Sequence, residues 1–384
     1  MPNLALVLTG GGARAAYQAG VVRALAEIWP RKASPFKIIT GMSAGSINAC
    51  QLAHTADDFM AGTERLWQLW NTLHIDKVFR SNSLSLLRLA TFVLRDLALG
   101  GFFPRPASNH LLDASPLRKL IEENVDFDRI HAHVKQGLLR AFAVTATNYR
   151  SGCAITFFDE TGDKQEWVRN NHLGFRRKLK VEHILGSSAI PVFFPAVNID
   201  GSFYGDGCVR LMTPVSPSLH LGAESVLAVG VRQPKDPARM LELSTLPSDD
   251  VNFADIAGVF MNAVFLDTLD TDLERLRRVN MTLRGMAPQA RENLENNFRT
   301  IPFDAVQPTK DLGLVASGSI DRYPFMMRHL LRGLGAGRKR GRDVLSYLAF
   351  DRSYCGKLLR MGYRDAMDRK DHLRQFMLQN ADPA

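Results

Sequence analysis

Short, almost wholly apolar runs recur along the chain and alternate with segments of helical spacing. The clearest runs are residues 4–9, 138–147, 153–158 and 225–231. An uninterrupted apolar run of this length is typical of a strand that is buried on both faces, as in a parallel sheet. The alternation of such strands with helices predicts an α/β fold with three layers and a mostly parallel central sheet.

The helical patterns change in character along the chain. Residues 57–135 are mostly helical in pattern, and we expect a helical cap or insert there. Its leucine-dense stretch, residues 84–99, has two interpretations: a helix packed on the core, or a lid or wall for an apolar ligand.

A change of pattern near residue 232 divides the chain. We expect one domain at residues 1–232 and a mostly helical C-terminal region at residues 233–384. Within that region we expect one late strand, at Asp304–Leu314.

The composition is that of a globular protein with a basic charge balance. Of the 384 residues, 46% are hydrophobic and 23% are charged, and the net charge is +9. The four cysteines are scattered, without a disulfide framework or zinc spacing, so we expect reduced thiols and a cytoplasmic protein. We find neither a signal-peptide pattern nor an apolar run of about 18 residues, so we expect no leader and no transmembrane helix.

A Gly-x-Ser-x-Gly sequence at residues 41–45 is the strongest chemical signal. The β-branched run Lys37–Thr40 precedes it and good helix formers follow it. Strand, sharp turn and helix are the context of a nucleophile elbow, in which Gly41 and Gly45 keep the crowded positions small. Ser43 would then lie at a helix N-terminus, where N–H groups and the dipole favour negative charge. The alternative is a turn that merely caps a helix.

A glycine-rich loop, Gly10-Gly11-Gly12-Ala13-Arg14, follows the first apolar run. It could be half of a dinucleotide fingerprint, which would make the chain a nucleotide-binding protein. However, Ala15 replaces the third glycine, and no acidic residue ends a second strand about 20 residues on. No Gly-Lys-Ser/Thr follows, which excludes a P-loop. We favour a third interpretation, in which successive N–H groups bind an oxyanion near Ser43.

A serine nucleophile needs a base. A Ser–His–Asp triad would need a histidine in a turn at a late strand. Among the ten histidines His220, before the run 225–231, comes nearest to this pattern, but none lies in a glycine-flanked turn. Asp206 lies between Gly205 and Gly207, which let the backbone turn tightly and expose the carboxylate. A carboxylate that is partly desolvated and close to the hydroxyl can act as a general base. The alternative is a surface Asp-Gly turn.

Taken together, these segments resemble the patatin-like phospholipase family. The resemblance rests on the glycine-rich loop, the serine elbow and Asp206-Gly207, in this order, and on Ser187-Ser188-Ala189-Ile190-Pro191, and it covers roughly residues 4–232. Cys208 departs from the pattern, because the family usually has Gly or Ala after Asp-Gly.

The resemblance implies roles for individual residues. It makes Ser43 the nucleophile and Asp206 the base of a catalytic dyad. It also places Gly11, Gly12 and Ala13 in the oxyanion hole, with Arg14 in the adjoining basic position. No metal and no cofactor are implied.

The implied activity is acyl transfer from a lipid ester to water, of the phospholipase A or lysophospholipase type. Two alternatives remain: a general carboxylesterase or lipase acting on other esters, and a non-catalytic lipid-binding scaffold with a relic site. The intact Ser43 and Asp206 are evidence against the scaffold.

A basic stretch near the C-terminus suggests a second partner. Residues 321–342 contain seven basic side chains and one acidic side chain, and apolar residues line one side of their helical pattern. We expect this stretch to dock the protein peripherally on anionic membranes. The alternative is a helix packed on the core with a solvated basic loop. Because no recognised motif or aromatic stacking platform accompanies the charge, we expect no nucleic-acid partner.

Overall fold

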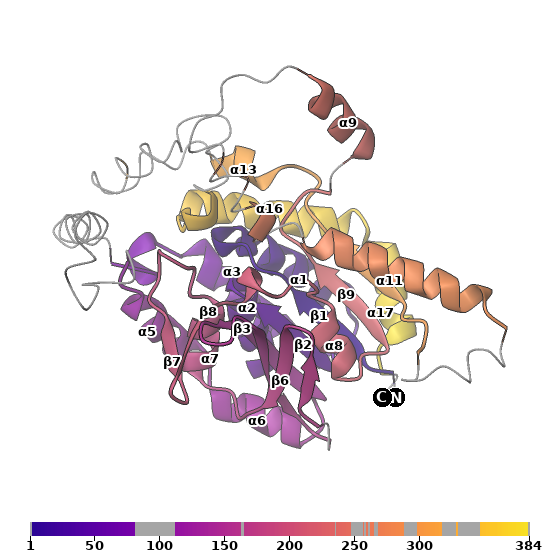
Figure 1. Cartoon of the computed structure of the whole chain (residues 1–384), viewed down its shortest axis with the longest axis horizontal. Coiled ribbons are helices and arrows are strands. Elements are labelled where there is room, and N and C mark those ends of the chain that lie inside the picture. The colour runs from indigo at the N-terminus through magenta and orange to yellow at the C-terminus, as the bar shows by residue number, and fades with distance from the viewer. Residues whose placement is uncertain are drawn as a thin grey trace.

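One mixed sheet with helices on both faces forms the centre of the molecule (Figure 1). The computed structural model describes residues 2–80, 112–162, 165–234, 236–246, 268–287, 298–316 and 346–382, with isolated positions at 256–264 and at 328. The strands within this part of the chain are β1 (Leu4–Leu8), β2 (Ile38–Met42), β3 (Ala141–Asn148), β4 (Ala154–Glu160), β5 (Trp167–Arg169), β6 (His172–Arg176), β7 (Val197–Ile199), β8 (Ser202–Asp206), β9 (Ser225–Val229) and β10 (Phe303–Val306).

The centre of the sheet is parallel and one side is mixed. In the row β10-β9-β1-β2-β3 every neighbouring pair is parallel, which confirms the predicted fold class. Beyond β3, strand β4 is antiparallel to β3, β6 is parallel to β4, and β5 is antiparallel to β6. A hairpin of β7 and β8 also pairs with β3, antiparallel. The sequence did not predict β5 to β8, because these short strands are partly exposed and lack an apolar run.

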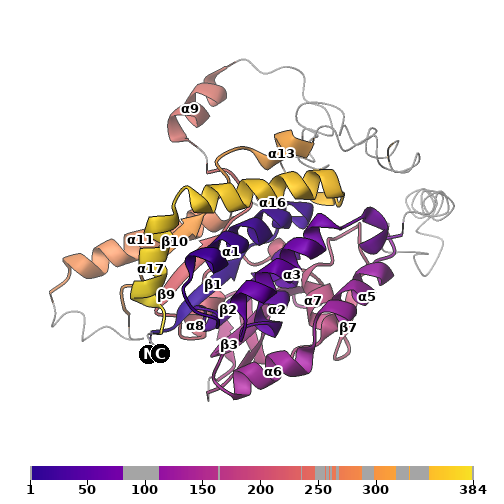
Figure 2. The same cartoon turned by 180° about the vertical axis from the view of Figure 1, so that it is seen from behind.

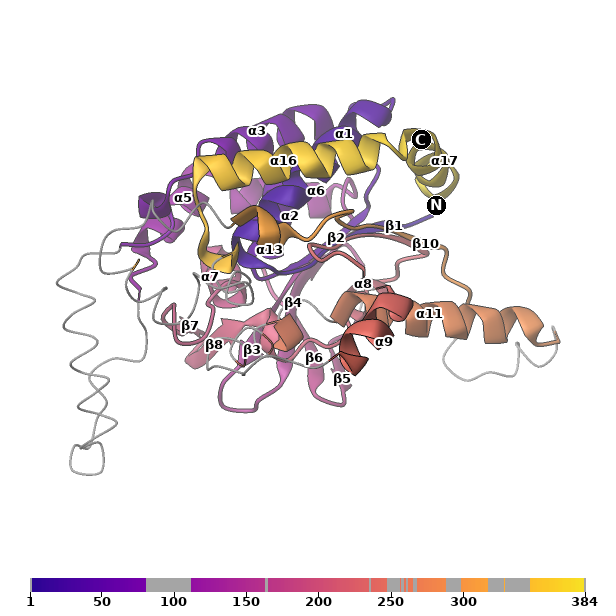
Figure 3. The ribbon, with the colours of Figure 1, turned by 90° about the horizontal axis from the view of Figure 1, so that it is seen from above.

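Helices cover the two faces of the sheet and produce the three layers (Figures 2 and 3). On one face lie α1, α2, α3, α6 and α16, and on the other lie α8 and α11. The described helices are α1 (Ala16–Ile28), α2 (Ala44–His54), α3 (Phe59–Asn71), α5 (Ser115–Asn124), α6 (Phe127–Lys135), α7 (Val181–Ser187), α8 (Ser216–His220), α9 (Pro237–Thr245), α11 (Thr268–Gly285), α13 (Leu312–Val315), α16 (Arg352–Met367) and α17 (Lys370–Asn380), with 3-10 turns η1 (Gly12–Ala15), η2 (Ile75–Lys77) and η4 (Gly207–Val209). In the part of the chain covered by the structure, no helix is both long enough and apolar enough to cross a bilayer.

Each central strand contributes side chains to two hydrophobic cores, one on each face of the sheet. Along β1 the side chains of Leu4, Leu6 and Leu8 join the core under α1, α2 and α16, whereas Ala5 and Val7 join the core under α8 and α11. Since successive side chains of a strand point to opposite faces, an all-apolar strand is what a sheet covered on both faces requires.

The late strand is shorter than predicted. It ends at Val306, and the apolar residues that follow form the short helix α13, so the expectation of one strand over Asp304–Leu314 is wrong. The Asp311 side chain accepts a hydrogen bond from the Gly313 N–H at 2.8 Å. This N-cap favours a helix over a continued strand.

The C-terminal region packs closely on the rest of the chain. β10 extends the sheet beside β9, and α16 lies along α1 and α3. Where α1 and α16 cross, Gly20 lies against the carbonyl of Leu359, and Gly362 lies against the carbonyl of Tyr17. A Cβ at either glycine would overlap the facing carbonyl oxygen. The division of the chain at residue 232 stays a prediction.

We predict that Gly362→Ala destabilises the protein. Alanine gains about 1 kcal/mol of helix propensity over glycine. Overlap with a backbone atom costs typically about 1–3 kcal/mol or more, because the two helices must move apart. A lower melting temperature in a thermal scan is therefore expected. Gly285→Ala in α11 is the control, since no atom lies within 4 Å of its added Cβ. Equal melting temperatures for the two variants would contradict close packing at this crossing.

Candidate functional site

Ser43 lies in the sharp turn between β2 and α2. Its backbone has φ 53° and ψ −135°, a left-handed conformation that costs energy for a residue with a side chain. A Cβ on Gly41 would lie 2.6 Å from the Gly45 carbonyl oxygen, and a Cβ on Gly45 would overlap β1 at Leu8. Both glycines are therefore required for the turn to pack beneath Ser43.

Two further serines hold the backbone of Ser43. The Ser43 N–H donates to the Ser187 Oγ at 3.1 Å, and the Ser187 hydroxyl donates to the Thr145 carbonyl at 2.6 Å. On the other side, the Ser46 hydroxyl donates to the Ser43 carbonyl at 2.6 Å. Sequence reasoning assigned no role to Ser46, and it noted Ser187 only as part of a similar segment. These bonds compensate for the strained backbone of the turn.

The Ser43 hydroxyl donates a hydrogen bond to Oδ2 of Asp206 at 2.5 Å. The other carboxylate oxygen, Oδ1, accepts from the Cys208 N–H at 2.9 Å. The Asp206 carbonyl accepts from the Thr147 hydroxyl at 2.7 Å, which ties the end of β8 to β3. Every acceptor group of Asp206 is thus held by a neighbouring element.

The Asp206 carboxylate is buried, so the expectation of an exposed carboxylate is wrong. Its exposed fraction is 0%, and that of Ser43 is 1%. Asp206 ends strand β8 instead of lying at the tip of a surface turn, and Gly207 packs against the Thr145 carbonyl. Burial raises the pKa of Asp206 to about 6, although the hydrogen bonds from Ser43 and Cys208 act in the opposite direction.

The glycine-rich loop lies directly beside Ser43. A Cβ on Gly10 would lie 2.8 Å from the Ser43 Cβ and would overlap the Cys208 sulfur. Gly12, with φ 56°, opens the 3-10 turn η1 and lines the same pocket as Ser43. The first N–H groups of a helical turn have no acceptor within that turn. A Cβ on Gly12 would overlap the Tyr347 carbonyl oxygen, so the loop is packed from behind by the C-terminal region.

Arg14 is buried against the C-terminal region. Its side chain is almost fully buried, and its Nε donates to the Ser346 Oγ at 2.7 Å. Its guanidinium lies 4.9 Å from the centre of the Tyr347 ring. The structure therefore places Arg14 between the glycine-rich loop and the C-terminal region.

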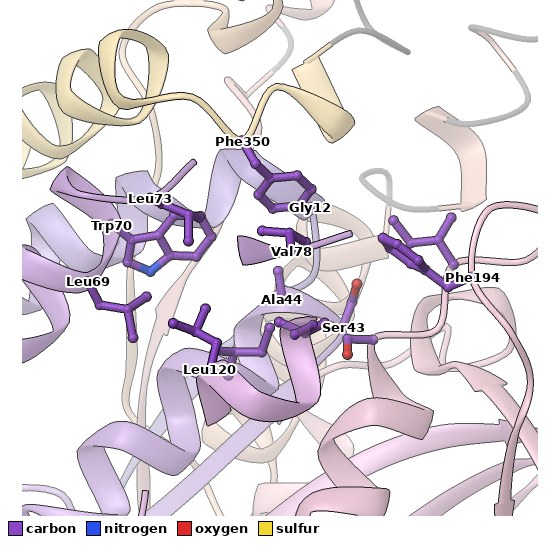
Figure 4. A pocket seen from close by; sticks show the side chains of 14 residues that line it. Gly12, Ser43, Ala44, Leu69, Trp70, Leu73, Val78, Leu120, Phe194 and Phe350 are labelled. Carbon is purple, nitrogen blue, oxygen red and sulfur yellow. The ribbon is translucent and has the colours of Figure 1, made fainter. Parts of the chain in front are cut away.

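An apolar pocket begins at Ser43 (Figure 4). Its walls come from α2, α3, α5, the segment after α7 and the C-terminal region. At one wall the Phe350 ring stacks on Trp70, with centroids 6.4 Å apart and an interplanar angle of 20°. The lining residues are Gly12, Ser43, Ala44, Ile47, Leu69, Trp70, Leu73, Val78, Leu117, Leu120, Ser188, Ile190, Phe194 and Phe350.

Comparison with known proteins decides the family. Residues 6–219, more than half of the chain, match the model described as patatin-like phospholipase. The chain belongs to this family. Membership supports a lipid acyl hydrolase. Among curated proteins, no sequence matches the chain.

Several solved structures are similar to this patatin-like protein at low identity. Human GIVD cytosolic phospholipase A2 in complex with methyl gamma-linolenyl fluorophosphonate is 13% identical, with 99% of this chain and 59% of that chain covered and a TM-score of 0.43. VipD from Legionella pneumophila is 13% identical over 97% of this chain and 67% of its own, with a TM-score of 0.35. The effector ExoU from Pseudomonas aeruginosa is 16% identical, with 96% of this chain and 74% of that chain covered and a TM-score of 0.29. This chain thus spans about three fifths of the human chain's length.

His220 lies in a different environment. Its ring stacks on Trp167, with centroids 5.0 Å apart, and lies 6.2 Å from the ring of His172. Burial lowers the pKa of His172 to about 4. Within the described residues, the hydrogen-bond partners of Ser43 and Asp206 include no histidine.

Two predicted segments lie outside the described residues. They are the leucine-dense stretch at 84–99 and, apart from Arg328, the basic stretch at 321–342. The described parts of 57–135 contain α3, η2, α5 and α6. Residues of α3 and α5 line the pocket, and so does Val78, which directly follows η2.

We predict that Ser187→Ala lowers the reactivity of Ser43. Without the Ser187 hydroxyl, the Ser43 N–H loses its acceptor and the turn can shift. A misplacement of a reacting group by about 1 Å can cost about 100-fold in rate. The rate of Ser43 labelling by a fluorophosphonate measures this effect without a chosen substrate. Ser218→Ala is the matched control, because Ser218 is equally buried and its hydroxyl donates to a local carbonyl, that of Val215. Labelling of both variants at the wild-type rate would show that the Ser187 bridge is dispensable.

We predict that Asp206→Asn stabilises the protein at high pH. Because the folded-state pKa of Asp206 is raised to about 6, the folded protein holds this proton at pH values where the unfolded chain has lost it. The wild type therefore loses stability as the pH rises from about 4 to about 6, by about 3 kcal/mol in total. Asparagine carries no charge. Its Oδ1 can accept from the Cys208 N–H, and its amide NH2 can donate to the Ser43 Oγ, which reverses the direction of that bond. Its melting temperature should exceed that of the wild type at pH 8.

The pH dependence distinguishes this effect from a general one. The gain from Asp206→Asn should shrink by about half at pH 5, where the folded wild type is mostly protonated. Asp200→Asn, at an exposed carboxylate, should show no comparable gain. A gain that is absent at pH 8, or the same at both pH values, would contradict a costly buried charge at Asp206.

Proposed function

We propose that this protein is a serine acyl hydrolase that cleaves fatty-acyl esters of lipids, of the phospholipase A or lysophospholipase type. The observation that carries the proposal is the 2.5 Å hydrogen bond from the Ser43 hydroxyl to the buried Asp206 carboxylate. It joins a serine at a strand–helix turn to a carboxylate that can take its proton. Ser43 lines the apolar pocket, so an acyl chain bound there would place its ester carbonyl near the Ser43 hydroxyl.

The first half of the reaction forms an acyl-enzyme. Asp206 takes the Ser43 proton while the Ser43 Oγ attacks the ester carbonyl carbon. The N–H groups of Gly11, Gly12 and Ala13 bind the oxyanion of the tetrahedral intermediate. When the intermediate collapses, the bond to the leaving alcohol breaks and that alcohol takes the proton from Asp206. The acyl group stays on Ser43.

The second half of the reaction hydrolyses the acyl-enzyme and regenerates the free enzyme. Asp206, ionised again, takes a proton from a water molecule as the water oxygen attacks the acyl carbonyl. The same N–H groups bind the second oxyanion. Collapse releases the fatty acid, and Asp206 returns its proton to the Ser43 Oγ.

The electrostatics of Asp206 suit a base without a histidine. With a pKa of about 6, the carboxyl is mostly ionised at neutral pH and yet more basic than an ordinary aspartate. The oxyanion loop matters as much, since losing one such donor typically costs about 3–4 kcal/mol of barrier. The loop is packed against Ser43 on one side and Tyr347 on the other, which supports a preorganised role.

The lining of the pocket supports an apolar acyl group as the part of the substrate that is bound. Apart from Gly12, Ser43 and Ser188, its lining side chains are apolar or aromatic. Removing a chain of methylenes from water contributes about 0.8 kcal/mol for each buried methylene. Long-chain esters are therefore expected to bind better than short ones, which favours a lipid over a small soluble ester.

We predict that Ser43→Ala abolishes both labelling and turnover. A fluorophosphonate probe should label the wild type on the peptide that contains Ser43 and should leave the variant unlabelled. Products from phospholipid, lysophospholipid and triacylglycerol panels would then identify the substrate class, with Ser43→Ala as the background. Hydrolysis of soluble esters alone would indicate a general carboxylesterase. Binding of lipid without hydrolysis, and without labelling, would indicate a scaffold.

A further inference from the structure

The Cys208 thiol lies inside the site, between the glycine-rich loop and the dyad. Cys208 follows Asp206-Gly207 in the 3-10 turn η4, and its exposed fraction is 2%. A Cβ added to Gly10 would overlap the Cys208 sulfur while lying 2.8 Å from the Ser43 Cβ. The sulfur therefore fills the space above Gly10, next to the nucleophile.

Both ends of Cys208 face groups of the site. Its N–H donates to Oδ1 of Asp206 at 2.9 Å. Its sulfur lies against Gly10 and beside Ser43, and the Cys208 thiol and the Asp206 carboxylate influence each other's pKa. A thiol can donate one hydrogen bond and accept another, so this sulfur can join the loop to the base.

We propose that Cys208 is a positioning residue, whose S–H donates to the Asp206 carboxylate and keeps the base oriented and ionised during the reaction. The proposal rests on the proposed function of Ser43 and Asp206. It assigns no covalent step to the sulfur.

The Asp206 carboxylate needs a hydrogen-bond donor other than Ser43 during the second half of the reaction. When Ser43 is acylated, Oδ2 of Asp206 loses the Ser43 hydroxyl as its hydrogen-bond donor. The Cys208 N–H and S–H then remain to hold the carboxylate while it activates water. Hydrogen bonds to the charged form of an acid lower its pKa, which opposes the effect of burial.

The protonation states of the neighbours are consistent with this role. Burial, and then the charge of Asp206, raises the pKa of the Cys208 thiol well above its ordinary value, so the S–H is retained at neutral pH. The charge of Asp206 also acts on Tyr149, although burial raises the pKa of Tyr149 more. Within the described residues, the groups that shift the pKa of Asp206 are Ser43 and Cys208, and no basic side chain is among them.

The test compares Cys208→Ala with Cys208→Ser across pH 5–8.5. Without the S–H donor, the apparent pKa of the base in the kcat/KM profile should rise. Cys208→Ala should thus be about three- to tenfold less active than wild type at pH 5.5 and within about twofold of it at pH 8. Cys208→Ser keeps a donor at the same atom and should restore the wild-type profile. Cys355→Ala, at another buried thiol, is the matched control and should leave the profile unchanged.

Each outcome decides the matter. If Cys208→Ala loses thermal stability but keeps the wild-type pH profile, the sulfur only fills space and the inference is wrong. If Cys208→Ser shifts the profile as Cys208→Ala does, the donor is not what matters, and the inference is equally wrong. Should Cys208→Ala fail to fold, the Cys208→Ser profile against wild type still decides, since a shift contradicts the proposal and its absence supports it. Wild-type protein that neither labels at Ser43 nor hydrolyses esters would overturn the proposed function, and this inference with it.

Discussion

The short contact between Ser43 and Asp206 depends on how strand β3 is shared. Strand β4 occupies one edge of β3 along Ala141–Thr147, so β2 and β8 must both use the other edge. Strand β2 covers that edge as far as the pair Met42–Thr145. The pairing with β8 starts at the next residue of β3, with the pair Ala146–Asp206, where β8 ends. The elbow stops β2 where β8 arrives from the opposite direction. Two residues 163 positions apart in sequence are therefore brought face to face by backbone pairing alone.

This arrangement costs stability, and the surrounding elements compensate for it. A strained serine backbone and a buried carboxylate are both unfavourable in isolation. Ser187 joins the strained turn to β3, and the Cys208 N–H satisfies the carboxylate. The C-terminal region also contributes, since Tyr347 packs behind the glycine-rich loop and Phe350 lines the pocket. Residues beyond the matched stretch, 6–219, thus complete the site.

The sequence predicted the parts of the molecule that depend on local pattern. Fully buried strands such as β1 and β9 are recognisable in the sequence as apolar runs. The elbow is recognisable because its turn requires small residues at the two glycine positions. The short strands β5 to β8 give no such signal, because partly exposed strands of three to five residues carry few apolar positions. The burial of Asp206 could not be read from its glycine neighbours, since it depends on where β8 pairs. For the same reason the Ser187 bridge, which spans 144 residues, has no local signal.

Trapping the covalent intermediate tests the central claim most directly. Rapid mixing of the protein with a slowly hydrolysed long-chain ester, followed by acid quench and peptide mass mapping, would locate the acyl group. The mechanism predicts a burst of released alcohol close to one per protein molecule and an acyl mass on the peptide that contains Ser43. Steady hydrolysis without a burst, or an acyl group on any other residue, would contradict a Ser43–Asp206 dyad.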